Sequence, residues 1–195
     1  IDYLNDVFKD RLGNTRIQAI WDQTDRTETD AANTYAHFGR VYEKDEIDRA
    51  IDADNNGENP YSYVAQRDTS GHGTLLASIS AGSYADGYVG VAPGSELLVV
   101  KLKQSKQYLR DFFLIKDDVP AFEESDIMLA LRFLEDYAIR LGKPLIIIFG
   151  LGSANGSRTG ASPLAEMMEN LTKKPNISVI TCMGNEANNK CHYKG

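Results

Sequence analysis

Apolar residues gather in four short runs that are separated by longer polar segments. The runs cover residues 15–21, 96–102, 144–149 and 177–183, and they are rich in β-branched side chains. The last three are almost continuously apolar, which is typical of strands covered on both faces. We therefore predict a strand at each of the four positions.

Helical periodicity occurs between these runs and predicts helices over residues 74–81, 123–142 and 162–171. The longest of them is followed by Gly142 and Pro144, which commonly end helices. Strands that alternate with helices favour an α/β fold with a mostly parallel sheet and helices on both faces. In such folds the chemistry gathers in the loops at the carboxyl ends of the strands.

Residues 22–70 differ from the rest of the chain because they are polar and acidic. We predict a long surface excursion here, with one short helix at 43–51. The chain has 195 residues and is 42% hydrophobic, which is enough for one domain with its own core.

Composition excludes several kinds of partner. The net charge is −7 and the basic residues form no stripe, so nucleic acid is an unsuitable partner. No apolar run reaches the roughly 20 residues that a membrane-spanning helix needs. The two cysteines, Cys182 and Cys191, match no metal or redox spacing, and we expect no metal and no cofactor.

The segment DADNNG resembles the start of a calcium-binding loop. Asp52, Asp54, Asn56 and Gly57 occupy the first, third, fifth and sixth positions of that loop, but the twelfth position is Tyr63 instead of a bidentate Glu. We therefore favour a solvated turn after a helix.

A second glycine-rich segment, GLGSANG, follows the predicted strand at 144–149. The third glycine of a dinucleotide-binding loop would stand at 155, which is Asn155, and no lysine follows to form a P-loop. A small-molecule binding module is therefore disfavoured. Gly150 and Gly152 still indicate that something approaches the backbone closely at the end of this strand.

His72 is the first candidate for catalysis. A single histidine is more often a turn residue or a satisfied core group than a catalyst. Here it lies between Gly71 and Gly73, which let a substrate backbone approach, and it precedes a helix of small residues. These surroundings favour a general base.

The residues around His72 carry a resemblance to a known family. GHGT (71–74) is similar to the histidine signature of the subtilases, the subtilisin-like serine endopeptidases. Further segments follow in the family's order, namely GVAP (90–93), LGS (151–153) and MGNEA (183–187). IDYLN, IWDQT, NPY and KLKQSKQYLRDFF more narrowly resemble the germination (Csp) proteases of spore-forming bacteria. This branch implies an extracellular or spore-associated location.

The resemblance implies a role for each matched residue. His72 would be the base of a Ser-His-Asp triad, and the Asn185 amide would stabilise the oxyanion. A protein or peptide substrate would lie between two walls, formed by Gly150, Leu151 and Gly152 on one side and by Thr181, Cys182, Met183 and Gly184 on the other. Met183 replaces a residue that is commonly small, so we expect a shallow P1 pocket.

The resemblance leaves His72 without its triad partners. It places the triad acid just before Ile1 and the nucleophile after Gly195, so residues 1–195 are expected to form a partial, incomplete subtilisin-like peptidase domain that is inactive alone. Asp68 shares a loop with His72 and is expected to hold the turn. Ser162 precedes Asn185, whereas the family's serine follows it, so Ser162 is rejected as nucleophile.

Two consequences follow for partners and function. Exposed edges of an incomplete sheet could drive self-association. The alternative function is a non-catalytic, subtilase-like regulatory or binding protein.

Overall fold

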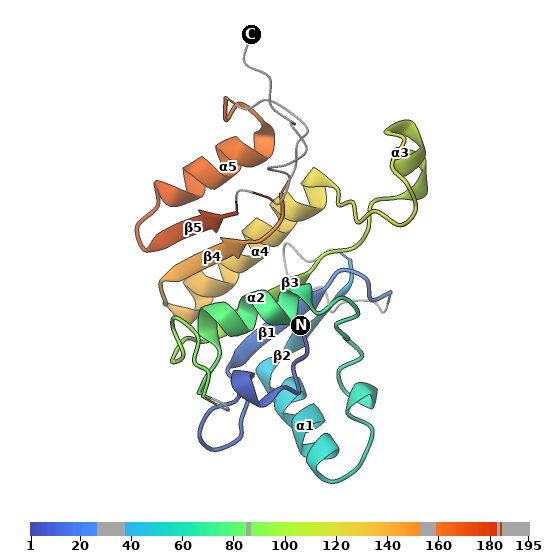
Figure 1. Ribbon diagram of the computed structural model, residues 1–195. Coiled ribbons are helices and arrows are strands. Elements are labelled where there is room, and N and C mark those ends of the chain that lie inside the picture. The colour runs from blue at the N-terminus through green and yellow to red at the C-terminus, as the bar shows by residue number, and fades with distance from the viewer. Residues whose placement is uncertain (27–37, 85–86, 153–158, 183, 185–195) are drawn as a thin grey trace. The chain divides into compact units, whose positions relative to one another are not determined.

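The computed structural model describes residues 1–26, 38–84, 87–152, 159–182 and 184 (Figure 1). The chain divides into two compact units, Ile1–Ala130 and Leu131–Gly195, and each is described by itself. Within the described residues, no helix combines the length and the apolar character needed to cross a bilayer.

The first unit contains a three-stranded sheet with the order β2-β1-β3. The central strand β1 (Ile17–Asp22) is antiparallel to β2 (Arg40–Glu43) and parallel to β3 (Leu97–Lys101). The strands predicted at 15–21 and 96–102 are therefore confirmed. The α/β class is confirmed as well, but the sheet of this unit is mixed because of β2.

Helix α1 (Lys44–Asn55) packs on β1 and β2 of this sheet (Figure 1). In chain order the helices of the first unit are the 3-10 helix η1 (Asp6–Phe8), α1, the 3-10 helix η2 (Pro60–Ser62), α2 (His72–Ala81) and α3 (Gln107–Phe112). Helix α1 starts with a capping box in which the Glu43 and Glu46 side chains accept each other's backbone N–H groups. Its inward face buries Ile47 and Ile51.

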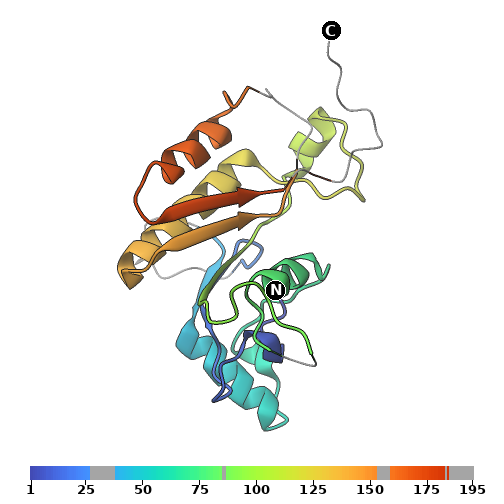
Figure 2. The ribbon, with the colours of Figure 1, turned by 60° about the vertical axis from the view of Figure 1, so that its left-hand side comes forward.

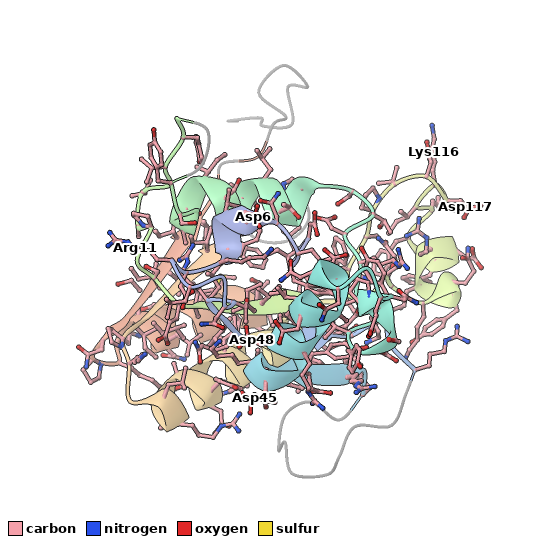
Figure 3. All side chains as sticks on the ribbon, turned by 90° about the horizontal axis from the view of Figure 1, so that it is seen from below. Asp6, Arg11, Asp45, Asp48, Lys116 and Asp117 are labelled. Carbon is pink, nitrogen blue, oxygen red and sulfur yellow. The ribbon has the colours of Figure 1, made fainter. Side chains whose placement is uncertain are left out.

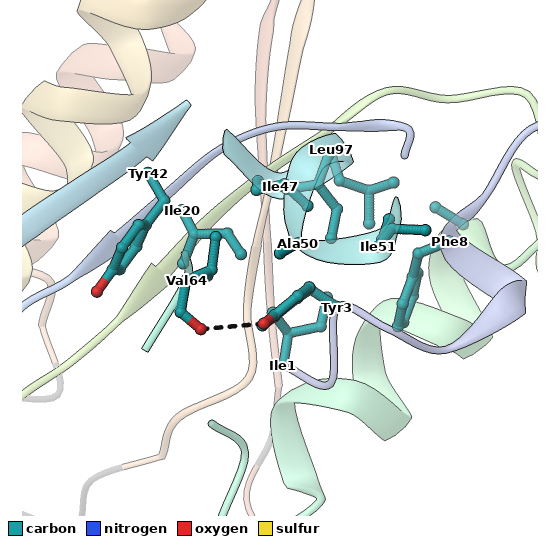
Figure 4. Close-up of a cluster of buried hydrophobic side chains, with 12 residues drawn as sticks. Ile1, Tyr3, Phe8, Ile20, Tyr42, Ile47, Ala50, Ile51, Val64 and Leu97 are labelled. Carbon is teal, nitrogen blue, oxygen red and sulfur yellow. Dashed lines mark hydrogen bonds between the residues drawn. The ribbon is translucent and has the colours of Figure 1, made fainter. Parts of the chain in front are cut away.

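The described residues of the 22–70 segment are not the surface excursion that the sequence predicted. Tyr42, Ile47 and Val64 from this segment are fully buried and form the core of the first unit with Tyr3 and Ile20. The Tyr3 hydroxyl donates a hydrogen bond of 3.0 Å to the Val64 carbonyl (Figure 4). The prediction was wrong because the buried residues of this segment are isolated apolar positions among polar and acidic ones, so the segment contains no apolar run that would have indicated burial.

The calcium-loop pattern lies mostly on a helix. Asp52 and Asp54 belong to the last turns of α1, and Gly57 follows with a φ of +75° as the chain leaves the helix. A helical backbone cannot wrap an ion as a twelve-residue loop does. Within the described part of the chain, no cluster of His, Cys, Asp or Glu side chains is arranged to hold a metal ion.

The second unit is a βαβ arrangement that follows helix α4 (Glu124–Leu141), which begins in the first unit. Strands β4 (Leu145–Phe149) and β5 (Ile177–Thr181) are parallel, and α5 (Pro163–Thr172) connects them and packs along β5 (Figure 2). All four elements were predicted.

Strand β4 buries only one of its faces. Leu145 and Ile147 are buried, whereas Ile146 is 63% exposed and Ile148 is 46% exposed. In the second unit taken by itself, β4 therefore has one buried and one exposed apolar face.

Candidate active site

His72 is the first residue of α2, and its side chain is exposed. The preceding residue, Gly71, has a φ of +76°, a left-handed conformation that residues with a Cβ rarely adopt. Glycine at this position lets the chain turn sharply into the helix. The turn presents His72 at the N-terminal end of α2, next to the chain's N-terminus (Figure 1).

Asp68 holds this turn, as the sequence predicted. One carboxylate oxygen accepts hydrogen bonds from the amides of Ser70 (3.0 Å) and Gly71 (2.8 Å). The other accepts from the Thr74 amide (3.1 Å) and the Thr74 hydroxyl. Both oxygens are therefore committed to the loop that carries His72, and this agrees with a structural role.

Hydrogen bonding also sets the charge state of Asp68. Burial alone would raise the pKa of this carboxyl. The hydrogen bonds from Thr74, Gly71 and Ser70 favour the charged form and outweigh burial, so the pKa lies well below its usual range. Asp68 is therefore an anion at neutral pH and a strong acceptor for the amides of the turn.

Thr74 is a residue of this site that the sequence did not single out. Its hydroxyl accepts a hydrogen bond of 2.7 Å from the Asp2 amide while it donates to Asp68. Thr74 is the third residue of α2, and Asp68 lies shortly before the helix. Since an aspartate before a helix often accepts hydrogen bonds from its first turn, the contact between the two residues could have been suspected from the sequence. The contact with Asp2 joins residues 72 positions apart, and no local pattern could have indicated it.

In the second unit, the predicted cleft residues lie at the carboxyl ends of the two parallel strands. Gly150, Leu151 and Gly152 follow β4, and Thr181 ends β5. A Cβ at Gly152 would lie 3.4 Å from the Cα of Gly184, so the two backbones approach closely. The structure thus brings the two predicted walls into contact at these glycines.

Of the remaining predicted site residues, Cys182 is among the described residues, whereas Met183 and Asn185 lie outside them. Cys182 follows β5 with an exposed free thiol. His72 belongs to the first unit and the glycine pair to the second.

Ser162 has a clear structural function. It is the N-cap of α5, and its hydroxyl accepts a hydrogen bond of 3.2 Å from the Ala165 amide. This use of the hydroxyl agrees with its rejection as a nucleophile.

The second unit also contains a hollow of about 310 Å³. Lys143, Leu145, Asn176 and Ile177 line it, together with residues from the end of α4. These residues lie at the amino ends of β4 and β5, away from the Gly152–Gly184 edge. The hollow is therefore separate from the candidate site.

Comparison with known proteins identifies close similarities. The model of the subtilase family, Peptidase S8, matches residues 8–194. Among solved structures, the CspB protease of Clostridium perfringens is similar, with a TM-score of 0.77 and 30% sequence identity. The match covers 96% of this chain and 35% of that protease, so the chain spans about a third of its length. A search of curated proteins found no match.

Proposed function

Because the chain belongs to the subtilase family, we propose that it forms part of a serine endopeptidase in which His72 acts as the general base. The observation that carries this proposal is the placement of His72. The side chain is exposed at the start of α2, and Gly71 and Asp68 fix its backbone. A general base needs access to its substrate and a rigid support, and this position offers both.

The oxyanion donor and the substrate walls belong to the same proposal. Asn185 would donate its amide to the tetrahedral oxyanion, and loss of such a donor typically costs about 10²–10³ in turnover. The position of the described wall residues at the carboxyl ends of the parallel strands β4 and β5 supports a peptide-binding edge there, because ligands of such sheets bind at that edge. Met183 would make the P1 pocket shallow, with small residues preferred over aromatic ones.

The isolated chain is proposed to be inactive. A triad acts as a unit, and a base without its nucleophile and acid retains almost no catalysis. Asp68 cannot readily replace the acid because four hydrogen bonds from the turn already occupy its two oxygens. The triad acid would border Ile1, by resemblance to the family.

The test uses the complete protein that contains this chain. Hydrolysis of fluorogenic peptides and labelling by a fluorophosphonate should both be lost in His72→Ala and retained in His37→Ala, a control of the same residue type. Equal hydrolysis by wild type and His72→Ala would contradict the proposal. Absence of any hydrolysis by wild type would favour a non-catalytic regulatory protein of the same family.

The resemblance to germination proteases also supports an extracellular or spore-associated location. Antibody detection of the protein in fractionated spores and culture medium tests this, and its confinement to vegetative cells would contradict it.

A further inference from the structure

Helix α2 begins without a capping side chain of its own. Its N-cap residue is Gly71, so the first turn lacks the hydroxyl or carboxylate that usually accepts a hydrogen bond from an early helical amide. Asp68 replaces it from three residues upstream and accepts from Gly71 and Thr74. The carboxylate therefore binds the backbone on both sides of His72.

Thr74 extends this support to a distant segment. Its hydroxyl accepts from the Asp2 amide at 2.7 Å and donates to Asp68. A hydroxyl has one proton to donate, so donation to the carboxylate leaves its lone pairs for the amide. The Asp2 amide, the Thr74 hydroxyl and the Asp68 carboxylate form a continuous chain of hydrogen bonds.

Packing confirms that the two segments lie close together. A Cβ at Gly73 would lie 3.9 Å from the backbone nitrogen of Ile1, so the first residues of the chain pass directly beside the first turn of α2. The chain of hydrogen bonds therefore fixes the position of the Ile1–Asp2 segment along the helix that begins with His72.

We propose that Asp68 and Thr74 are positioning residues that hold His72 in register with the Ile1–Asp2 segment. This inference rests on the proposed function, in which the triad acid borders that segment. Catalytic groups must be held within about 0.5 Å of their productive geometry. Neither residue contacts the reacting atoms, and each acts through the backbone that carries the base or borders the acid.

The decisive variants alter the hydroxyl of Thr74. Thr74→Val keeps the shape and removes the hydrogen bonds to Asp2 and Asp68, whereas Thr74→Ser keeps the hydroxyl. In the complete protein, Thr74→Val should lower kcat by about 10- to 100-fold per folded molecule. KM should stay within about twofold, and Thr74→Ser should recover most of kcat. A merely structural residue would change the yield of folded enzyme and leave kcat per active site unchanged.

Hydrogen exchange in the 195-residue chain tests the contact itself. The Asp2 amide should exchange about tenfold faster in Thr74→Val and at the wild-type rate in Thr74→Ser. Ser78→Ala is the control, because the Ser78 hydroxyl donates to the Leu75 carbonyl of the same helix. It should leave exchange at Asp2 and kcat unchanged.

The outcomes separate this inference from the proposed function. Unchanged exchange at Asp2 in Thr74→Val would overturn the inference. Faster exchange with a wild-type kcat would also overturn it, while the loss of activity in His72→Ala would still support the proposed function. Hydrolysis that does not depend on His72 would overturn both.

Discussion

The amide of Gly71 donates a hydrogen bond of 2.8 Å to the carboxylate of Asp68, across the turn that leads into α2. Both residues are needed for the sharp turn into α2. Glycine permits the left-handed conformation with a φ of +76°, and the aspartate satisfies the amides that this conformation presents. The exposed His72 follows directly, so the geometry of the candidate base depends on this pair.

Replacement of Gly71 tests the importance of the left-handed turn. Apart from its chain neighbours, no described heavy atom lies within 4 Å of a Cβ at Gly71, so Gly71→Ala introduces backbone strain without a steric clash. We expect a loss of about 1–2 kcal/mol in the free energy of unfolding, measured with urea. Gly94→Ala is the matched control, because its Cβ also meets open space and its φ is not left-handed; it should change stability by less than about 0.5 kcal/mol. Equal effects of the two variants would contradict this account of the turn.

Asp68 should make stability depend on acidity. Its pKa is lower in the folded protein than the value of about 3.9 in an unfolded chain, so its contribution is fully present above pH 4. The contribution is lost as the pH falls from about 4 towards the folded pKa. Asp68→Asn should cost about 1–3 kcal/mol at pH 6, because charge-assisted hydrogen bonds are lost.

The difference between Asp68→Asn and wild type should therefore shrink as the pH falls below about 4. Urea titrations at a series of pH values measure it. Asp117→Asn, which alters an exposed carboxylate in the loop after α3, serves as the control (Figure 3). A constant difference across the whole range would exclude Asp68 as the titrating group.

Much of the fold could be predicted because its strands and helices carry apolar residues at regular spacing. Strands β1, β3, β4 and β5 and the helices α2, α4 and α5 were all found this way. Strand β2 was missed because its four residues bury only Tyr42. Helix α3 was missed because its six residues do not form an amphipathic pattern with a buried apolar face. Tyr108 and Phe112 are exposed, and the buried residue of the helix is Arg110.

The candidate site was predictable to the extent that its signals are local. His72 and the turn-holding role of Asp68 lie within a few residues of each other, and capping rules connect them. The link from Thr74 to Asp2 depends on how distant segments pack. The glycines after β4 indicated that a backbone approaches there, but they could not indicate Gly184, which follows β5 and is distant in sequence.

Arg16 should contribute strongly to the stability of the first unit. Its side chain is 9% exposed, and the guanidinium donates to the carbonyls of Val7, Ala81 and Ser95. Arg16→Met fills similar space but removes the donor to the Ala81 and Ser95 carbonyls, while the Val7 carbonyl keeps the Ser83 amide, so we expect a loss of about 2–4 kcal/mol in unfolding free energy. Arg11→Met is the control, since Arg11 projects into solvent (Figure 3), and it should change stability by less than about 0.5 kcal/mol. Similar losses in both variants would disprove this role for Arg16.

Arg110 should hold the loop that follows α3. Its buried guanidinium donates to the carbonyls of Lys116 (2.6 Å) and Val119 (2.9 Å), and thereby closes the loop on the helix. Arg110→Met should open the loop. In limited proteolysis with trypsin, cleavage after Lys116 should then be about tenfold faster than in wild type. Lys106→Met, which changes an exposed residue at the start of α3, should leave the rate at Lys116 unchanged. Resistance of Lys116 to cleavage in Arg110→Met would contradict this function.

The exposed face of β4 should cause self-association at high protein concentration. Ile146 and Ile148 lie on this face, and Ile180 of β5, which pairs with Ile148, is 55% exposed beside them. A short sheet with an apolar face and open edges favours contact with another copy. The double variant Ile146→Thr/Ile148→Thr keeps good strand-forming residues and should shift sedimentation towards the monomer. Ile139→Thr removes a comparably exposed isoleucine from α4 and should sediment as wild type does. If the double variant and wild type associate equally at every concentration, this face is not the contact.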